Sequence, residues 1–284
     1  MKTIEGSLDF RRVDALPHIL DIHGDLRVES GATIAKEALV GGSAKVGEGV
    51  RLRALKAAGS IDLGPRVTIE RWIDTGARLS VSDGCQLGAR ATAGKEIILG
   101  ADVQFHLLSA PCIVVGSAES QSYERHSVPS RPVAEFGNPS RCRPRADGAL
   151  LTVSDFIIPD GASAAGDVIA RGDIRIGRQA TIRGSLHSET DVLIGEGAVI
   201  TGSVYAERTL HLGENAVISE HALTAGSAII ESGARVGSPG RITTLLADQF
   251  VELNAGAILY GRIVSAHGGV TRAAQNTSVK AVAN

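Results

Sequence analysis

The stretch IGEGAVITGSVYAERTLH, residues 194–211, consists of three segments of six residues, and Leu212 begins the same pattern again. In each segment the first and fifth residues are apolar or small, as Ile194 and Ala198 are. The fifth residue of one segment and the first of the next are two positions apart, so both side chains face the same side of a short strand. Gly, Glu and Ser are frequent between them and are typical of corners. Three strands and three corners therefore form one triangular coil.

This pattern recurs at an interval of eighteen residues through the second half of the chain. Three parallel series show it: Ala162, Ala180, Ala198, Ala216 and Ala234; Ile158, Ile176, Ile194, Leu212 and Ile230; Ala164, Ile182, Ile200, Ile218 and Val236. A fixed period near twenty residues is typical of a solenoid, whose units bury their apolar faces against their neighbours. An α-helix would need a period of about 3.6 residues. We therefore predict an all-β fold, a parallel β-helix built as a triangular solenoid in which each coil takes eighteen residues.

The first half of the chain carries the same period with one deletion. The inward series Val28, Val46, Leu63, Val81 and Leu99 advances by eighteen positions at every step except the second, which is seventeen. Lys56 falls on an inward position of this frame, which predicts a bulge in that coil. The chain is therefore expected to contain two β-helical lobes.

Breaks in the period predict the domain boundaries. We expect an N-terminal cap or tail over 1–15, a first lobe over 16–115, a linker over 116–149, a second lobe over 150–265 and a flexible tail over 266–284. The linker contains four prolines, many serines and several arginines, and it lacks apolar periodicity. The tail is polar and rich in small residues.

Composition narrows the classes of function. The net charge of −2 implies no general attraction to nucleic acid, and aromatic residues make up only 3% of the chain. Three cysteines do not form a disulfide framework, and Cys85 falls on an inward position. The first ten residues, MKTIEGSLDF, include acidic side chains where a signal peptide would be apolar. We expect a cytoplasmic protein that does not bind nucleic acid.

No residues are predicted to be catalytic, cofactor-binding or metal-ligating. Stacked residues on adjacent coils differ by eighteen, whereas the steps from His187 to His211 and from His211 to His221 are twenty-four and ten. A metal site needs ligands at short spacing or at the stacking interval. The Gly-x-Gly pieces at 47–49 and 195–197 recur with the coils and precede no helix, so they are corners rather than phosphate loops. We expect no enzyme activity, no cofactor and no small-molecule substrate.

A solenoid is expected to associate with other copies through its ends. The end strands and the apolar cross-section of a solenoid are unpaired unless they are capped. Leu253, Leu259 and Ile263 belong to the final coil, and the tail after Ala266 is too small and polar to form a plug. These three residues are the predicted self-assembly site. The alternative is that the two lobes cap or pair with each other.

One family resembles the second lobe in the order of its motifs. Gly166-Asp-Val-Ile-Ala170, Gly184-Ser-Leu-His-Ser188 and Gly202-Ser-Val-Tyr-Ala206 follow the pattern Gly-(Asp/Ser)-aliphatic-x-small. Strands such as Asp173-Ile-Arg-Ile-Gly177 follow each copy. This succession resembles the bactofilin family, polymer-forming bacterial cytoskeletal proteins with a compact right-handed β-helix. Bactofilins typically have one β-helix between short tails, whereas two are expected here.

The resemblance implies a right-handed, non-enzymatic scaffold. It further implies a homopolymer that forms filaments without nucleotide and organises cell-shape or envelope machinery. The implied partners are other copies of the chain, envelope-associated proteins and the inner membrane surface.

The alternative family is the left-handed hexapeptide-repeat acyltransferases, which also use eighteen residues per coil. In those enzymes a glycine or small polar residue tends to follow the inward aliphatic residue on all three sides. In the second lobe this holds mainly on one side, at Gly177, Gly195 and Gly213. Without a suitably placed histidine, the scaffold is the favoured interpretation.

Overall fold

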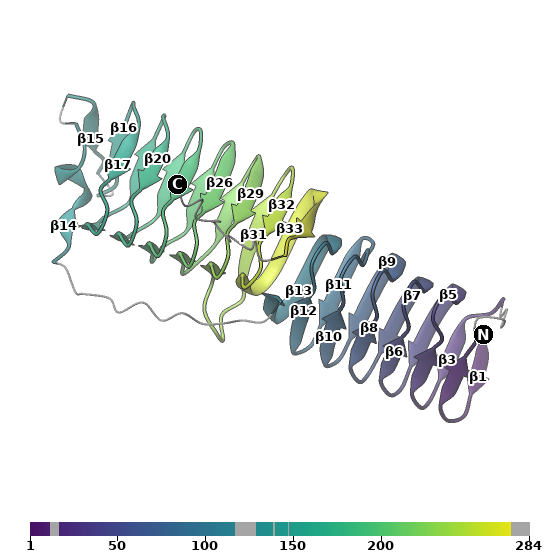
Figure 1. Cartoon of the computed structure of the whole chain (residues 1–284). Coiled ribbons are helices and arrows are strands. Elements are labelled where there is room, and N and C mark those ends of the chain that lie inside the picture. Colours follow the sequence, from purple (N-terminus) through teal and green to yellow (C-terminus); the bar gives the residue numbers. More distant parts are fainter. Residues whose placement is uncertain (12–16, 117–128, 139, 147, 274–284) are drawn as a thin grey trace, which may run out of the picture.

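A computed structural model of the chain describes residues 1–11, 17–116, 129–138, 140–146 and 148–273. The described residues form about 14 coils of a β-solenoid with roughly 18 residues per coil. Figure 1 shows two stacks of coils that meet end to end, with β1 at one outer end and β14 and β15 at the other. The all-β solenoid expected from the period is confirmed.

The first lobe contains thirteen strands in the part of the chain that the structure describes. They are β1 (Lys2–Ile4), β2 (Leu8–Phe10), β3 (Leu20–Ile22), β4 (Leu26–Val28), β5 (Thr33–Val40), β6 (Ala44–Val46), β7 (Arg51–Ala57), β8 (Ile61–Leu63), β9 (Thr68–Thr75), β10 (Arg78–Val81), β11 (Arg90–Ala93), β12 (Glu96–Leu99) and β13 (Gln104–Val115). Every pairing between these strands is parallel, and most strands pair with the strand two places further along the chain.

The second lobe begins with a short irregular section and continues as three regular ladders. Its elements are β14 (Arg131–Pro132), the 3₁₀ turn η1 (Val133–Glu135), β15 (Cys142–Pro144), β16 (Leu150–Thr152), β17 (Phe156–Ile158), β18 (Ser163–Ala165), β19 (Val168–Ala170), β20 (Ile174–Ile176), β21 (Thr181–Arg183), β22 (Leu186–Ser188), β23 (Val192–Ile194), β24 (Val199–Ile200), β25 (Val204–Ala206), β26 (Thr209–Leu212), β27 (Val217–Ile218), β28 (Ala222–Thr224), β29 (Ser227–Ile230), β30 (Arg235–Val236), β31 (Thr243–Ala247), β32 (Val251–Leu253) and β33 (Ile258–Thr271). From β16 onward, most strands pair with the strand three places along, one coil away.

The strand register confirms the inward series. Val28, Val46, Leu63, Val81 and Leu99 are successive ladder partners, and so are Ile158, Ile176, Ile194, Leu212 and Ile230. All ten side chains are buried. Because the ladder stacks like on like, each aliphatic residue packs on the residue one coil away, and the core is continuous through each lobe.

One corner of each coil places a residue in the left-handed backbone region. In the second lobe these residues include Gln179, Gly197, Asn215 and Gly233, with φ between 55° and 68°. The conformation costs little for glycine and is tolerated by asparagine. The stacked corners explain why glycine recurs at this position.

The solenoid extends further at both termini than the breaks in the period predicted. β1 and β2 pair in register with β3 and β4, so the first coil begins before Leu16. β33 continues to Thr271, which is fully buried, so the predicted tail over 266–284 is wrong in its first residues. Residues 274–284 of that predicted tail lie outside the described residues. The apolar pattern missed these segments because small and polar side chains occupy many of their positions.

The coil around Lys56 contains the expected bulge, but the lysine does not point inward. Between Leu52 and Ala54 the register shifts against the neighbouring strand. As a result Leu55 is buried and the Lys56 side chain is exposed, with its ammonium 3.8 Å from a carboxylate oxygen of Asp74. The bulge therefore keeps the charge out of the core.

Candidate functional site

The two lobes meet through an antiparallel pair formed by β13 and β33. Ile113 lies opposite Leu259, and Leu108 lies opposite Ile263. All four side chains are buried. The last coil of each lobe therefore closes the apolar cross-section of the other, and the two C-terminal ends of the solenoids cap each other.

The predicted self-assembly residues all lie at or next to this junction. Leu259 and Ile263 face the first lobe directly. Leu253 lies on β32, paired with Ile230 on one side and Thr271 on the other. None of the three residues is at a free end in this structure. Self-assembly through them stays a prediction, and it would require the β13–β33 junction to open first.

Main-chain hydrogen bonds and one buried hydroxyl tie the lobes together. The amides of Asp102 and Gly256 donate to the carbonyls of Thr271 and Val115, over 2.9 and 2.7 Å. The buried Thr271 hydroxyl accepts from the amide of Val103 at 2.9 Å and donates to the carbonyl of Gly100 at 2.7 Å. A buried hydroxyl with both of its hydrogen bonds formed holds the end of β33 in one position against the first lobe.

The surroundings of Cys85 and Cys112 favour the protonated thiol. Burial raises the pKa of the Cys85 thiol, and burial followed by the Glu96 carboxylate raises the pKa of Cys112. Burial also raises the pKa of Tyr260, followed by the effect of Cys112. A reactive cysteine has a lowered pKa, and the surroundings of these two thiols shift the pKa in the other direction.

The outer end of the first lobe has unpaired strand edges. β1 pairs with β3 and β2 pairs with β4, and no other described strand lies along their outer edges. Ile4 and Leu8 are half-buried, and Met1 and Ile19 are exposed. The period predicted such an open end at the C-terminus of the second lobe, whereas the structure has it at the N-terminus of the first.

The outer end of the second lobe is partly capped by residues assigned to the linker. β15 pairs antiparallel with β16 and covers its edge. Val133 of η1 is buried against Gly166, and the Arg131 guanidinium lies 4.6 Å from the centre of the Phe136 ring. The prediction of a linker throughout 116–149 is therefore wrong for this section. Residues 117–128 lie outside the described part.

Beside this cap, the edge of β17 pairs with no described strand on its outer side. Val153 and Ile157 are exposed next to that edge. Both outer ends of the rod therefore combine an unpaired strand edge with exposed apolar side chains.

His187, His211 and His221 of the second lobe have separate surroundings. His187 stacks on the ring of Tyr205, with the ring centres 4.7 Å apart. His211 lies 2.8 Å from a carboxylate oxygen of Glu231, and Nδ1 of His221 accepts from the amide of Thr244. Among the described residues no group of three or more His, Cys, Asp or Glu side chains is placed to hold a metal ion. His126 lies outside the described residues.

No helix in the described part of the chain is long and apolar enough to cross a bilayer.

Comparisons with models of known protein families, with curated proteins and with solved structures give no match for this chain.

Proposed function

We propose that this protein is a non-enzymatic, self-assembling cytoskeletal scaffold of the cytoplasm. Its polymer forms without nucleotide and organises cell-shape or envelope machinery, through contact with envelope-associated proteins or the inner membrane surface. The motif succession of the second lobe, which resembles that of bactofilins, supports this proposal from the sequence. The distribution of exposed apolar residues supports it from the structure.

Apolar exposure at the ends is the observation that carries the proposal. Seven large hydrophobic side chains are exposed in the described residues. Four of them lie at or next to the outer ends of the rod: Met1 and, one coil further in, Ile19 at one end, and Val153 and Ile157 at the other. Exposed apolar groups beside unpaired strand edges favour association with another strand.

The mutual capping of the lobes decides which ends are available. With the C-terminal ends joined by β13 and β33, each chain presents only the N-terminal ends of its two lobes (Figure 1). These ends differ, because one carries the β15 cap and the other does not. A contact between unlike ends repeats without closing and gives a filament.

Charge substitutions at the ends test this contact. Ile19→Asp and Ile157→Asp are each expected to shorten or abolish the assemblies of the wild type, measured by sedimentation velocity and by electron microscopy, with or without ATP or GTP. Ile242→Asp is the matched control, because Ile242 is exposed on the loop before β31, away from both ends. A wild type that sediments as a monomer at every concentration would refute the polymer.

The absence of catalysis is a separate part of the proposal. The acyltransferase alternative is tested by turnover assays with acyl-CoA donors. We expect no saturable rate. A reproducible rate that is abolished by replacing a single histidine would favour the acyltransferase instead.

A further inference from the structure

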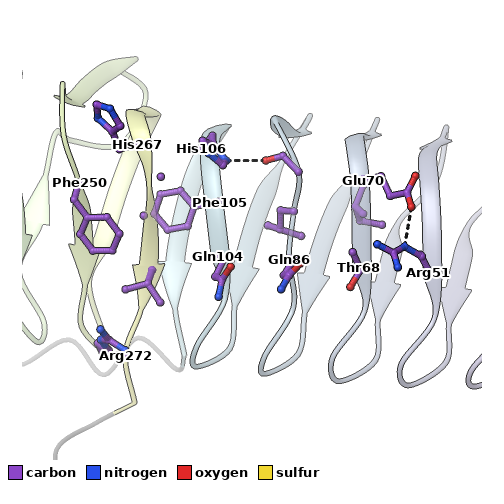
Figure 2. Close-up of a pocket in the computed structure, with 16 residues that line it drawn as sticks. Arg51, Thr68, Glu70, Gln86, Gln104, Phe105, His106, Phe250, His267 and Arg272 are labelled. Atoms are coloured by element: carbon purple, nitrogen blue, oxygen red, sulfur yellow. Dashed lines mark hydrogen bonds and ion pairs between the residues drawn. The ribbon is translucent and has the colours of Figure 1, made fainter.

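A groove of about 630 Å³ lies where the two lobes meet (Figure 2). The first lobe supplies Thr68, Gln86 and Gln104, which lie in a line in the figure. The second lobe supplies Phe250 and His267, which Figure 2 shows beyond the Gln104 end of this row. The groove is therefore complete only when the lobes are joined.

The row of polar side chains has free hydrogen-bonding capacity. Thr68, Gln86 and Gln104 are successive ladder partners, so their Cα atoms span about 10 Å. Their side chains form no hydrogen bond to any described residue. This differs from other stacked outward pairs, such as Arg78 and Glu96, which form an ion pair with each other. An amide and a hydroxyl each donate and accept. The row thus offers uncharged donors and acceptors at regular spacing.

The charged groups of the groove are neutralised by their neighbours. Nε of Arg51 lies 2.7 Å from a carboxylate oxygen of Glu70. The Arg272 guanidinium lies 3.5 Å from Glu252 and 3.7 Å from Asp102. Each described cation of the groove is therefore engaged by a carboxylate, which leaves little to recognise a phosphate or a carboxylate of a ligand.

Two imidazoles add acceptors at the edge of the groove. Nδ1 of His106 lies 3.2 Å from the carbonyl oxygen of Gly88, and Nδ1 of His267 lies 3.0 Å from that of Asp248. A carbonyl only accepts, so Nδ1 carries the proton in both rings and a neutral ring keeps Nε2 as an acceptor. Both acceptors suit a ligand that is rich in hydroxyl donors.

The backbone beneath the polar row is already paired. The amides of Gln86 and Gln104 donate to the carbonyls of Val67 and Cys85, each over 2.9 Å. An extended peptide that binds by adding a strand needs free main-chain groups. Recognition in this groove must therefore come from side chains and from the exposed ring of Phe250, which offers an apolar face.

We infer that the groove binds a neutral, extended oligosaccharide that lies along the row of Thr68, Gln86 and Gln104 with one sugar face against Phe250. Sugar hydroxyls use the free amides and imidazole acceptors, and an uncharged ligand matches the balanced charges. This ligand goes beyond the scaffold function and does not depend on polymer formation.

Isothermal titration calorimetry on the full chain tests the site, with cellohexaose, chitohexaose and maltohexaose as probes. We expect saturable binding of at least one of them. Gln86→Ala combined with Gln104→Ala, and separately Phe250→Ala, should raise its Kd about tenfold or more, because each change removes contacts without burying an unpaired group.

Two controls match these variants. Lys45→Ala combined with Asp62→Ala removes two exposed, stacked side chains from another side of the first lobe, and Leu193→Ala removes an exposed apolar side chain from the second. Both should leave the Kd unchanged. The inference is overturned if no probe binds saturably, if the groove variants bind as tightly as the wild type, or if an uncharged peptide of alternating threonine and glutamine binds instead.

Discussion

At the residue scale, the two glycines of each Gly-x-Gly corner are needed for different physical reasons. A Cβ atom at Gly195 would lie 2.8 Å from the amide nitrogen of Arg178 one coil away, so this position needs a residue without a side chain. A Cβ atom at Gly197 would make only an ordinary van der Waals contact, 3.5 Å from Cγ of Gln179, but the φ of 64° lies in the left-handed region. The first glycine permits close stacking of coils, and the second permits the turn.

Substitutions at Gly197 separate backbone strain from steric clash. Asn215 holds the same corner one coil further on, with φ of 55°. Gly197→Val should therefore lower the free energy of unfolding by about 1–3 kcal/mol, whereas Gly197→Asn should lower it by less than about 1 kcal/mol. Chemical denaturation of both variants measures the difference. Equal midpoints would show that the corner is not strained for a branched residue.

The hydroxyl of Thr190 lowers the pKa of the Asp173 carboxyl. The hydroxyl of Thr190 donates to Asp173 over 2.8 Å and is the main reason that the pKa of this carboxyl lies below 3.8, with Arg175 contributing. A lowered pKa means that the charged form stabilises the fold above about pH 3.8 and that this stability is lost as pH falls through the folded pKa.

Replacing the Thr190 hydroxyl by a methyl group should therefore raise the pKa of Asp173. In Thr190→Val the pKa of Asp173 should rise toward 3.8, as measured by NMR of its carboxyl carbon, and the variant should unfold at a higher pH in acid. Thr181→Val is the control, because the Thr181 side chain forms no hydrogen bond to any described residue. An unchanged Asp173 titration in Thr190→Val would assign the shift to the arginine instead.

At the scale of elements, the period predicts which residues face inward but not where the pairing ends. Phe156 and Ile158 alternate inward on β17 as expected. By contrast, β14 and β15 carry prolines and arginines that give no apolar pattern, and they pair because the end of the second lobe presents free edges to them. The eighteen-residue period could not predict the β13–β33 pair either, because this pair is antiparallel and joins residues that are far apart in the chain.

A charge in the β13–β33 pair should open the junction without unfolding the lobes. Ile263 is fully buried opposite Leu108, so Ile263→Asp places an unpaired carboxylate in an apolar contact. Hydrogen exchange should become faster in β13 and β33 and stay slow in β20 and β23. The control is Arg262→Asp on the exposed neighbouring position. Unchanged protection of β13 in Ile263→Asp would contradict the pairing.

At the scale of the whole molecule, the proposed filament and the groove both depend on how the two lobes are arranged. The sequence left more than one arrangement open, because it allowed free ends as well as lobes that cap or pair with each other. The structure joins them end to end, so that one ladder runs through both lobes. Its successive partners are Arg27, Lys45, Asp62, Ser80, Ile98, Val114, Ile258, Arg235, Val217, Val199 and Thr181.

The distance between spin labels at Arg27 and Thr181, measured by double electron–electron resonance, tests this arrangement most directly. Cys112 and Cys142 would be replaced by serine, and Cys85 is buried. Ten ladder steps separate the labelled positions, which predicts about 48 Å with a narrow distribution. Labels at Arg27 and Ile98, four steps apart within the first lobe, provide the reference at about 19 Å. A much shorter separation between Arg27 and Thr181 would mean that the lobes lie side by side, and a broad distribution would mean that they are not joined; either result would contradict the end-to-end rod.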